Sequence, residues 1–157
     1  MPTDSPGGSL RAGEYDSSTY SLNLVLTPWQ RLSLNGTFSL HDSFTRTADN
    51  GDPAVDDYEG DIYSVLIGAT FMVDKKTNIS ANYSYSRGDF SQDNAASGLP
   101  LGIEYEQHTL QAGFATQVGD KLWVDLQYLF QQYEEPTSAK LNDYTAHGIF
   151  ANCTLRW

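Results

Sequence analysis

The chain has 157 residues and a formal net charge of −11, with 39% hydrophobic, 18% charged and 13% aromatic residues. The excess of acidic residues argues against nucleic-acid binding, which requires clustered Lys and Arg to neutralise phosphates. The mean hydropathy of −0.44 and the short apolar runs argue against membrane-spanning helices. The single cysteine, Cys153, leaves no disulfide framework and no CxxC motif for a metal or a haem.

Polarity alternates every second residue in seven segments, which is typical of strands with one apolar and one polar face. Residues 1–17 are rich in Gly, Ser, Pro and acidic residues, and we expect them to form an irregular N-terminal segment. We then expect strands at residues 18–26, 31–41, 62–73, 78–86, 105–118, 122–132 and 143–157.

The connections between these strands alternate in length. Those at 27–30, 74–77 and 119–121 are short, whereas those at 42–61, 87–104 and 134–142 are long. Transmembrane β-barrels combine strands of about ten residues with short periplasmic turns and long extracellular loops. A soluble β-sandwich is the alternative, but its strands are commonly only about five or six residues long. We therefore expect an all-β, antiparallel, up-and-down transmembrane barrel formed by residues 18–157.

The number of expected strands is odd, whereas bacterial barrels have an even number and both termini in the periplasm. If the last strand ends in the periplasm, the strand at 18–26 must run inward from outside, and an outward-running strand should precede it. We therefore expect the chain to be the C-terminal part of a larger barrel, with residues 1–17 left from an extracellular loop. The competing interpretation is a small eight-stranded barrel in which residues 8–17 form a frayed strand.

The closing segment alternates up to its final aromatic residue, with Phe150 as the one exception. One face carries five residues: Ile149, Ala151, Cys153, Leu155 and Trp157. A terminal strand of this kind resembles the closing strand of Gram-negative outer-membrane β-barrels. That resemblance implies an outer-membrane location, contact with lipid and lipopolysaccharide, and recognition of these five residues by the barrel-assembly machinery.

A narrower resemblance concerns the tail AHGIFANCTLRW and the Asp–Tyr pair that precedes it, Asp143 and Tyr144. Over about fifteen residues it is similar to the closing strand of decahaem-associated barrels, which sheathe a multihaem cytochrome. It would imply electron transfer across the outer membrane through haems carried by that partner. Because the chain has no CxxCH motif, we expect no cofactor in it.

The polar face is rich in Ser, Thr, Asn and Gln, and in a wide barrel such a face lines an aqueous lumen. The expected lumen-lining residues are Arg31, Asn35, Asn82, Gln111, Asp125, Gln127 and Arg156. No basic ladder or aromatic row stands out on this face. The pattern predicts a pore or conduit wall of the porin type. A sheath for a cytochrome and a small structural or adhesive barrel remain alternatives.

Sequence motifs give little support to catalysis or metal binding. There is no GxSxG or HExxH motif, and His41, His108 and His147 fall on different strands, so we expect no enzyme. The acidic loop offers weak Ca²⁺ ligands, but their spacing is not that of an EF-hand. These candidates are Asp52, Asp56, Asp57 and Glu59. We expect a solvated loop that divalent cations could bridge to lipopolysaccharide phosphates.

Overall fold

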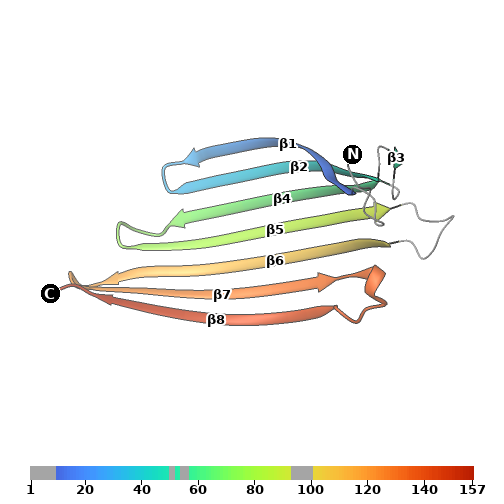
Figure 1. Cartoon of the computed structure of the whole chain (residues 1–157). Helices are drawn as coiled ribbons and strands as arrows, with labels where there is room; N and C mark the ends of the chain where they lie inside the picture. The colour runs from blue at the N-terminus through green and yellow to red at the C-terminus, as the bar shows by residue number, and fades with distance from the viewer. Residues whose placement is uncertain (1–9, 50–51, 54–56, 93–100) are drawn as a thin grey trace.

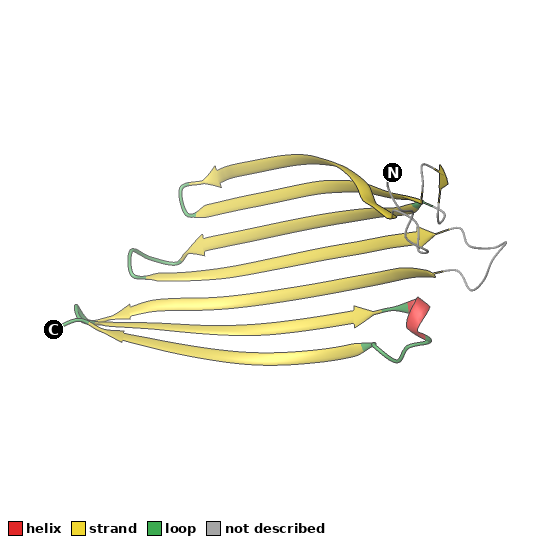
Figure 2. Ribbon diagram, viewed as in Figure 1, coloured by secondary structure: helices red, strands yellow, loops and turns green. Residues whose placement is uncertain are grey.

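The computed structural model describes residues 10–49, 52–53, 57–92 and 101–157, and the side chains of residues 14–46, 57–91 and 103–157. These residues form one antiparallel sheet with seven long strands and one strand of two residues (Figures 1 and 2). The elements are β1 (Leu10–Trp29), β2 (Leu32–Asp49), β3 (Asp52–Pro53), β4 (Tyr58–Met72), β5 (Thr77–Gln92), β6 (Leu101–Val118), β7 (Leu122–Glu134), the 3₁₀ turn η1 (Pro136–Ser138) and β8 (Tyr144–Leu155).

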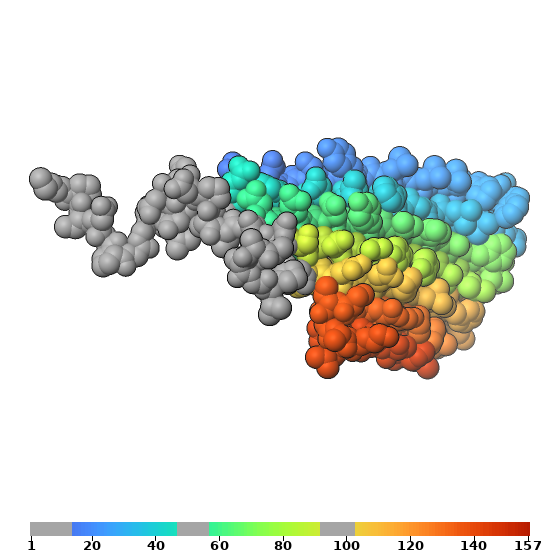
Figure 3. Space-filling model, turned by 90° about the vertical axis from the view of Figure 1, so that its right-hand side faces the viewer, coloured from blue at the N-terminus to red at the C-terminus, as the bar shows by residue number. Residues whose placement is uncertain are grey.

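The seven long strands follow one another in chain order across the sheet. The order is β1-β2-β4-β5-β6-β7-β8, and β3 pairs only with β2. Within the described residues β1 and β8 do not pair, so the sheet is open. In the space-filling view of Figure 3, the described residues form bands of colour that follow one another from blue to red, in the order of the sequence. The predicted up-and-down antiparallel fold is therefore confirmed.

The strands extend further than expected at the end that carries the long connections. β1 begins at Leu10 and pairs with β2 as far as Asp49, with register shifts between Arg11 and Glu14 and between Leu26 and Trp29. The expected irregular structure is thus wrong for residues 10–17, while residues 1–9 lie outside the described part. Strand pairing needs only backbone groups. It can therefore continue where both faces are polar and no alternation marks a strand.

The short connections all lie at one end of the sheet, together with the C-terminus (Figure 1). Between β6 and β7, Gly119 adopts a φ of 64°, a left-handed conformation that glycine reaches without steric cost. Between β4 and β5, the Asp74 side chain accepts a hydrogen bond of 2.7 Å from the Lys76 amide. Such local bonds close tight turns and fix the register of the two flanking strands.

The distribution of apolar side chains is the reverse of that in a water-soluble protein. Among the described residues, the buried hydrophobic core consists of Ala115 alone, at 7% exposure. Large apolar residues are exposed instead, for example Leu22 at 70% and Ile149 at 76%. The register places most of them on one face of the sheet, here called the outward face, whereas Val25, Leu66 and Phe150 lie on the other, polar face. An apolar face of this extent is stable only when a nonpolar medium or another protein covers it.

The apolar band on the outward face matches the thickness of a membrane. On β4 it runs from Tyr63 to Phe71 and ends at Asp61. With a rise of about 3.3 Å per residue and a tilt of about 40°, this band is about 20 Å tall, close to the ~25 Å of outer-membrane barrels. No helix in the described parts of the chain is long and apolar enough to cross a membrane.

The polar face is the more crowded of the two. A Cβ atom added to Gly88 on this face would collide with the rings of Tyr105 and Phe90. A Cβ atom added to Gly36 on the outward face would come no closer than 4.0 Å to the nearest atom, the Leu66 carbonyl oxygen. Side chains therefore converge on the polar face and diverge on the outward face, as they do in the wall of a barrel.

We predict that Gly88→Ala lowers the free energy of unfolding by about 1–3 kcal/mol, because two packed rings must move. Gly36→Ala should leave it unchanged or raise it by up to about 1 kcal/mol, because glycine is unfavourable within a strand. Urea unfolding in phospholipid vesicles measures both effects. Equal stability of the two variants would contradict the difference in crowding between the polar face and the outward face.

Candidate pore-lining face

A row of amide side chains crosses the middle of the polar face. The register places Asn35 opposite Gly68, Gly68 opposite Asn82, and Asn82 opposite Gln111. The side-chain amides of Asn35 and Asn82 both reach over Gly68, which is buried beneath them. Three of the residues expected from the sequence to line the lumen therefore lie in one row across four strands.

A hydrogen-bonded network continues this row onto β7. The side-chain amide of Gln111 donates to the side-chain oxygen Oε1 of Gln127 at 2.9 Å, and the side-chain amide of Gln127 donates to the Asp125 carboxylate at 2.9 Å. Asp125 is the acid at the centre of this face, and Asn152 of β8 stands opposite it. The network holds the Asp125 carboxylate in place, with charge-assisted hydrogen bonding that is stronger than bonding between neutral groups.

Hydroxyl groups occupy the polar face closer to the long connections. Ser39 and Ser64 are hydrogen-bonded at 2.6 Å, and Thr37 donates to Asn23 at 2.8 Å. The polar face therefore consists mainly of neutral hydrogen-bonding groups. Water or the polar surface of another protein could be accommodated there without burying an unpaired charge.

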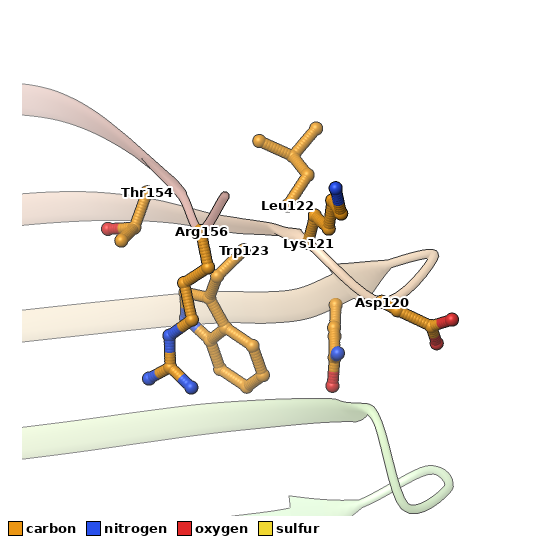
Figure 4. Close-up of a pocket in the computed structure, with 7 residues that line it drawn as sticks. Asp120, Lys121, Leu122, Trp123, Thr154 and Arg156 are labelled. Carbon is orange, nitrogen blue, oxygen red and sulfur yellow. The ribbon is translucent and has the colours of Figure 1, made fainter.

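The two expected lumen arginines lie apart from these residues, at the short-turn end. Arg31 donates to the Val73 carbonyl oxygen at 3.1 Å and so ties two turns together. Arg156 lines a cavity of about 360 Å³ that also includes Trp123 and Gln117. In Figure 4 the Arg156 guanidinium lies beside the Trp123 ring. The structure brings five of the seven expected residues together, and their role in lining a lumen stays a prediction.

The residues expected to form the assembly signal share the outward face of β8. Ile149, Ala151 and Cys153 stand opposite Tyr128, Leu126 and Val124 of β7, and Leu155 stands opposite Leu122. Trp157 follows the end of the strand and is fully exposed. Their recognition by the assembly machinery stays a prediction.

The calcium candidates are only partly described. Asp57 is paired with Arg46 at 3.4 Å, and Glu59 is exposed on β4. Asp56 and the side chain of Asp52 lie outside the described part. Within the described residues, no group of three or more His, Cys, Asp or Glu side chains is arranged to hold a metal ion.

Two features of the outward face depend on the strand register, which the sequence pattern does not give. Near the outer limit of the apolar band, the hydroxyls of Tyr83 and Tyr128 are hydrogen-bonded at 2.8 Å to His108 and His147, respectively. Barrels carry aromatic girdles of this kind at the membrane interface. Just beyond the girdle, Arg87 contacts Glu104 at 2.6 Å and Glu106 at 3.6 Å.

The second feature is an acidic ladder beyond the apolar band. Its members stand directly opposite one another on four adjacent strands: Asp42, Asp61, Asp89 and Glu104. Like charges at directly opposed positions destabilise a sheet. Arg87 contacts only Glu104 of this ladder, at one end of it.

We predict that Asp61→Asn raises the free energy of unfolding by about 0.2–1 kcal/mol at low ionic strength, because Asp61 faces an acid on each side. The gain should shrink in 1 M salt, where the screening length is about 3 Å. Asp120→Asn at the opposite end is the control, since its exposed contact with Lys76 contributes little. Urea unfolding at both salt concentrations tests this, and an equal gain in the control would refute it.

Comparison with known families agrees with this architecture. Residues 12–153 match the family model of outer membrane β-barrel porins named MtrB/PioB. No match was found among curated proteins or among solved structures. The predicted outer-membrane barrel and its location in the bacterial outer membrane are thereby confirmed. The chain belongs to the MtrB/PioB family of outer-membrane β-barrel porins.

Proposed function

We propose that the chain forms part of the wall of a hydrophilic conduit across the outer membrane. The observation that carries this proposal is the reversed polarity of the sheet, with neutral polar side chains on the crowded face and large apolar side chains on the exposed face. Lipid covers the outward face in this arrangement, and the polar face borders the lumen. The role is passive, and no catalytic residue is assigned.

The charges of the wall are unevenly distributed along the conduit axis. The short-turn end carries five bases: Arg31, Lys75, Lys76, Lys121 and Arg156. The opposite end carries the acidic ladder. In the usual orientation of outer-membrane barrels, with short turns in the periplasm, the acidic end is extracellular, so the outer mouth attracts cations and repels anions. Divalent cations could also bridge the outward-facing acids to lipopolysaccharide phosphates.

A second candidate function is a sheath around a multihaem cytochrome. The resemblance of the closing strand to decahaem-associated barrels supports it. So does the neutral polar face, because amides and hydroxyls that are already hydrogen-bonded can pack against a partner protein without a large desolvation cost. In this case the haems belong to the partner, and the conduit carries electrons instead of solutes.

Ala81 and Asn82 are adjacent in the sequence but lie on opposite faces of the sheet, so a chemical probe at each position tests which face borders the conducting path. Ala81 is exposed on the outward face and Asn82 lies in the amide row of the polar face. Each is changed to Cys in a Cys153→Ala background, which removes the natural thiol. We predict that an anionic, membrane-impermeant methanethiosulfonate lowers the single-channel conductance of the Asn82→Cys protein in planar bilayers. The Ala81→Cys protein should be unaffected, since lipid covers that thiol.

Three results would count against the polar face as the wall of an open pore. If the reagent lowers the conductance of the Ala81→Cys protein but not that of the Asn82→Cys protein, the assignment of the two faces is reversed. A channel that responds at neither position would exclude the polar face from the conducting path. A protein that does not conduct and is labelled at position 82 only after a haem protein has been removed would establish the sheath.

A further inference from the structure

The polar face carries a row of aromatic rings near its outer end. One ring comes from each of five adjacent strands, β4 to β8, and together they are called the aromatic collar: Tyr58, Phe90, Tyr105, Tyr133 and Tyr144. Tyr58 and Phe90 stack with ring centroids 6.2 Å apart. On the other side, Tyr105 and Tyr133 stack at 5.8 Å, and Tyr133 and Tyr144 at 5.3 Å.

Glycines join the two stacks into one row. The rings of Phe90 and Tyr105 both occupy the space where a side chain of Gly88 would lie. The Phe90 ring also covers Gly60 on the neighbouring strand. Because Gly60 and Gly88 have no side chain, rings from adjacent strands can occupy this space and pack against the sheet.

Hydrogen bonds fix the phenol groups at the β7–β8 end of the collar. The Tyr133 hydroxyl donates to the Glu135 carboxylate at 3.1 Å, and the Gln131 side chain donates to the Tyr144 oxygen at 2.8 Å. Rings held in this way lose little further side-chain entropy when a ligand binds, so the collar is preorganised.

The collar follows the rim of the barrel. From β4 to β7, each successive ring lies one polar-face position closer to the short-turn end than the ring before it. The outer limit of the apolar band shifts in the same direction, from Tyr63 on β4 to Tyr85 on β5 and Phe130 on β7. The rings therefore lie at a nearly constant height, just beyond the membrane band at the outer mouth.

The charge around the collar decides which ligands suit it. The described side chains at this end include many acids: Glu14, Asp16, Asp42, Asp57, Glu59, Asp61, Asp89, Glu104, Glu106, Glu134, Glu135 and Asp143. The bases among them are Arg46, Arg87 and Lys140. The potential at the collar is therefore negative, and aromatic faces themselves attract cations.

We propose that the aromatic collar is a binding site for organic cations that have a flat, apolar body. The flat body lies against the rings, and the positive charge is attracted by the ring faces and by the acidic rim. The proposal rests on the proposed function in one respect, since the polar face must be open to solvent at the outer mouth. Anions of the same shape should be excluded by the rim.

Equilibrium binding of two dyes to the native protein in lipid nanodiscs tests the proposal. The cationic probe is the ethyl ester of tetramethylrhodamine, and the anionic probe is fluorescein, which has the same flat ring system. Fluorescence anisotropy should show saturable binding of the cation and none of the anion. Tyr105→Ala and Tyr144→Ala should each weaken the binding of the cation about two- to fivefold.

Two control variants separate the collar from nonspecific effects. Tyr133→Phe keeps the ring and should bind the cation nearly as well as the native protein. Tyr63→Ala removes an aromatic residue from the outward face and should not change binding. Gel mobility without boiling verifies that each variant has folded, because folded barrels migrate differently from unfolded chains.

The outcomes are distinct. Equal binding of both dyes, or an equal effect of Tyr63→Ala and Tyr105→Ala, would overturn the proposal, because neither the charge of the dye nor the rings of the collar would then determine binding. Dye binding requires no conductance. Cation binding by a protein that does not conduct would support the collar while contradicting the open pore, and conduction without cation binding would do the reverse.

Discussion

The structure depends on one constraint, the need to pair every backbone amide and carbonyl group within a nonpolar medium. The long antiparallel strands meet it through their ladders, which leaves the side chains free to divide between lipid and lumen. The same requirement applies to the outer edges of β1 and β8. Both strands run toward the short-turn end, so direct pairing between them would be parallel. One or more additional strands between these edges, odd in number, would keep every pairing antiparallel, as in bacterial barrels.

The sequence predicted the strands well wherever one face of the sheet is apolar and the other is polar. The strand expected at 122–132 is observed as Leu122–Glu134, and the one expected at 62–73 as Tyr58–Met72. Beyond the membrane both faces meet water, and selection for alternating polarity is lost. Residues 10–17 and 42–49 form strands for this reason without carrying the pattern, because their ladders are continued from the membrane segments. The alternation of polar and apolar residues depends on what surrounds a strand. It therefore identifies a strand only where the two faces of the sheet meet different surroundings.

The same limit applies to the candidate site. Alternation placed Asn35, Asn82 and Gln111 on one face, but it could not show that the register aligns them in one row around Gly68. Register depends on the length and geometry of each turn, and a change of one residue would move a whole strand to the other face. The aromatic collar shows that the expectation of no aromatic row on the polar face was wrong. Each strand contributes one ring, and several of these rings lie in the strand extensions where the pattern fades.

The two faces act together in the proposed conduit. The apolar band fixes the height of the sheet in the membrane, and the collar and acidic rim therefore stand at the outer mouth. A cation that enters from outside meets the rim and the rings first, then the neutral amide row with the single charge of Asp125. It is then opposed by Arg31 and Arg156 at the inner end. Attraction followed by repulsion favours occupancy of the mouth over rapid passage. With the polar face lining the lumen, the outer mouth would thus hold cations in a saturable site, while neutral polar solutes would meet neither the attraction nor the barrier.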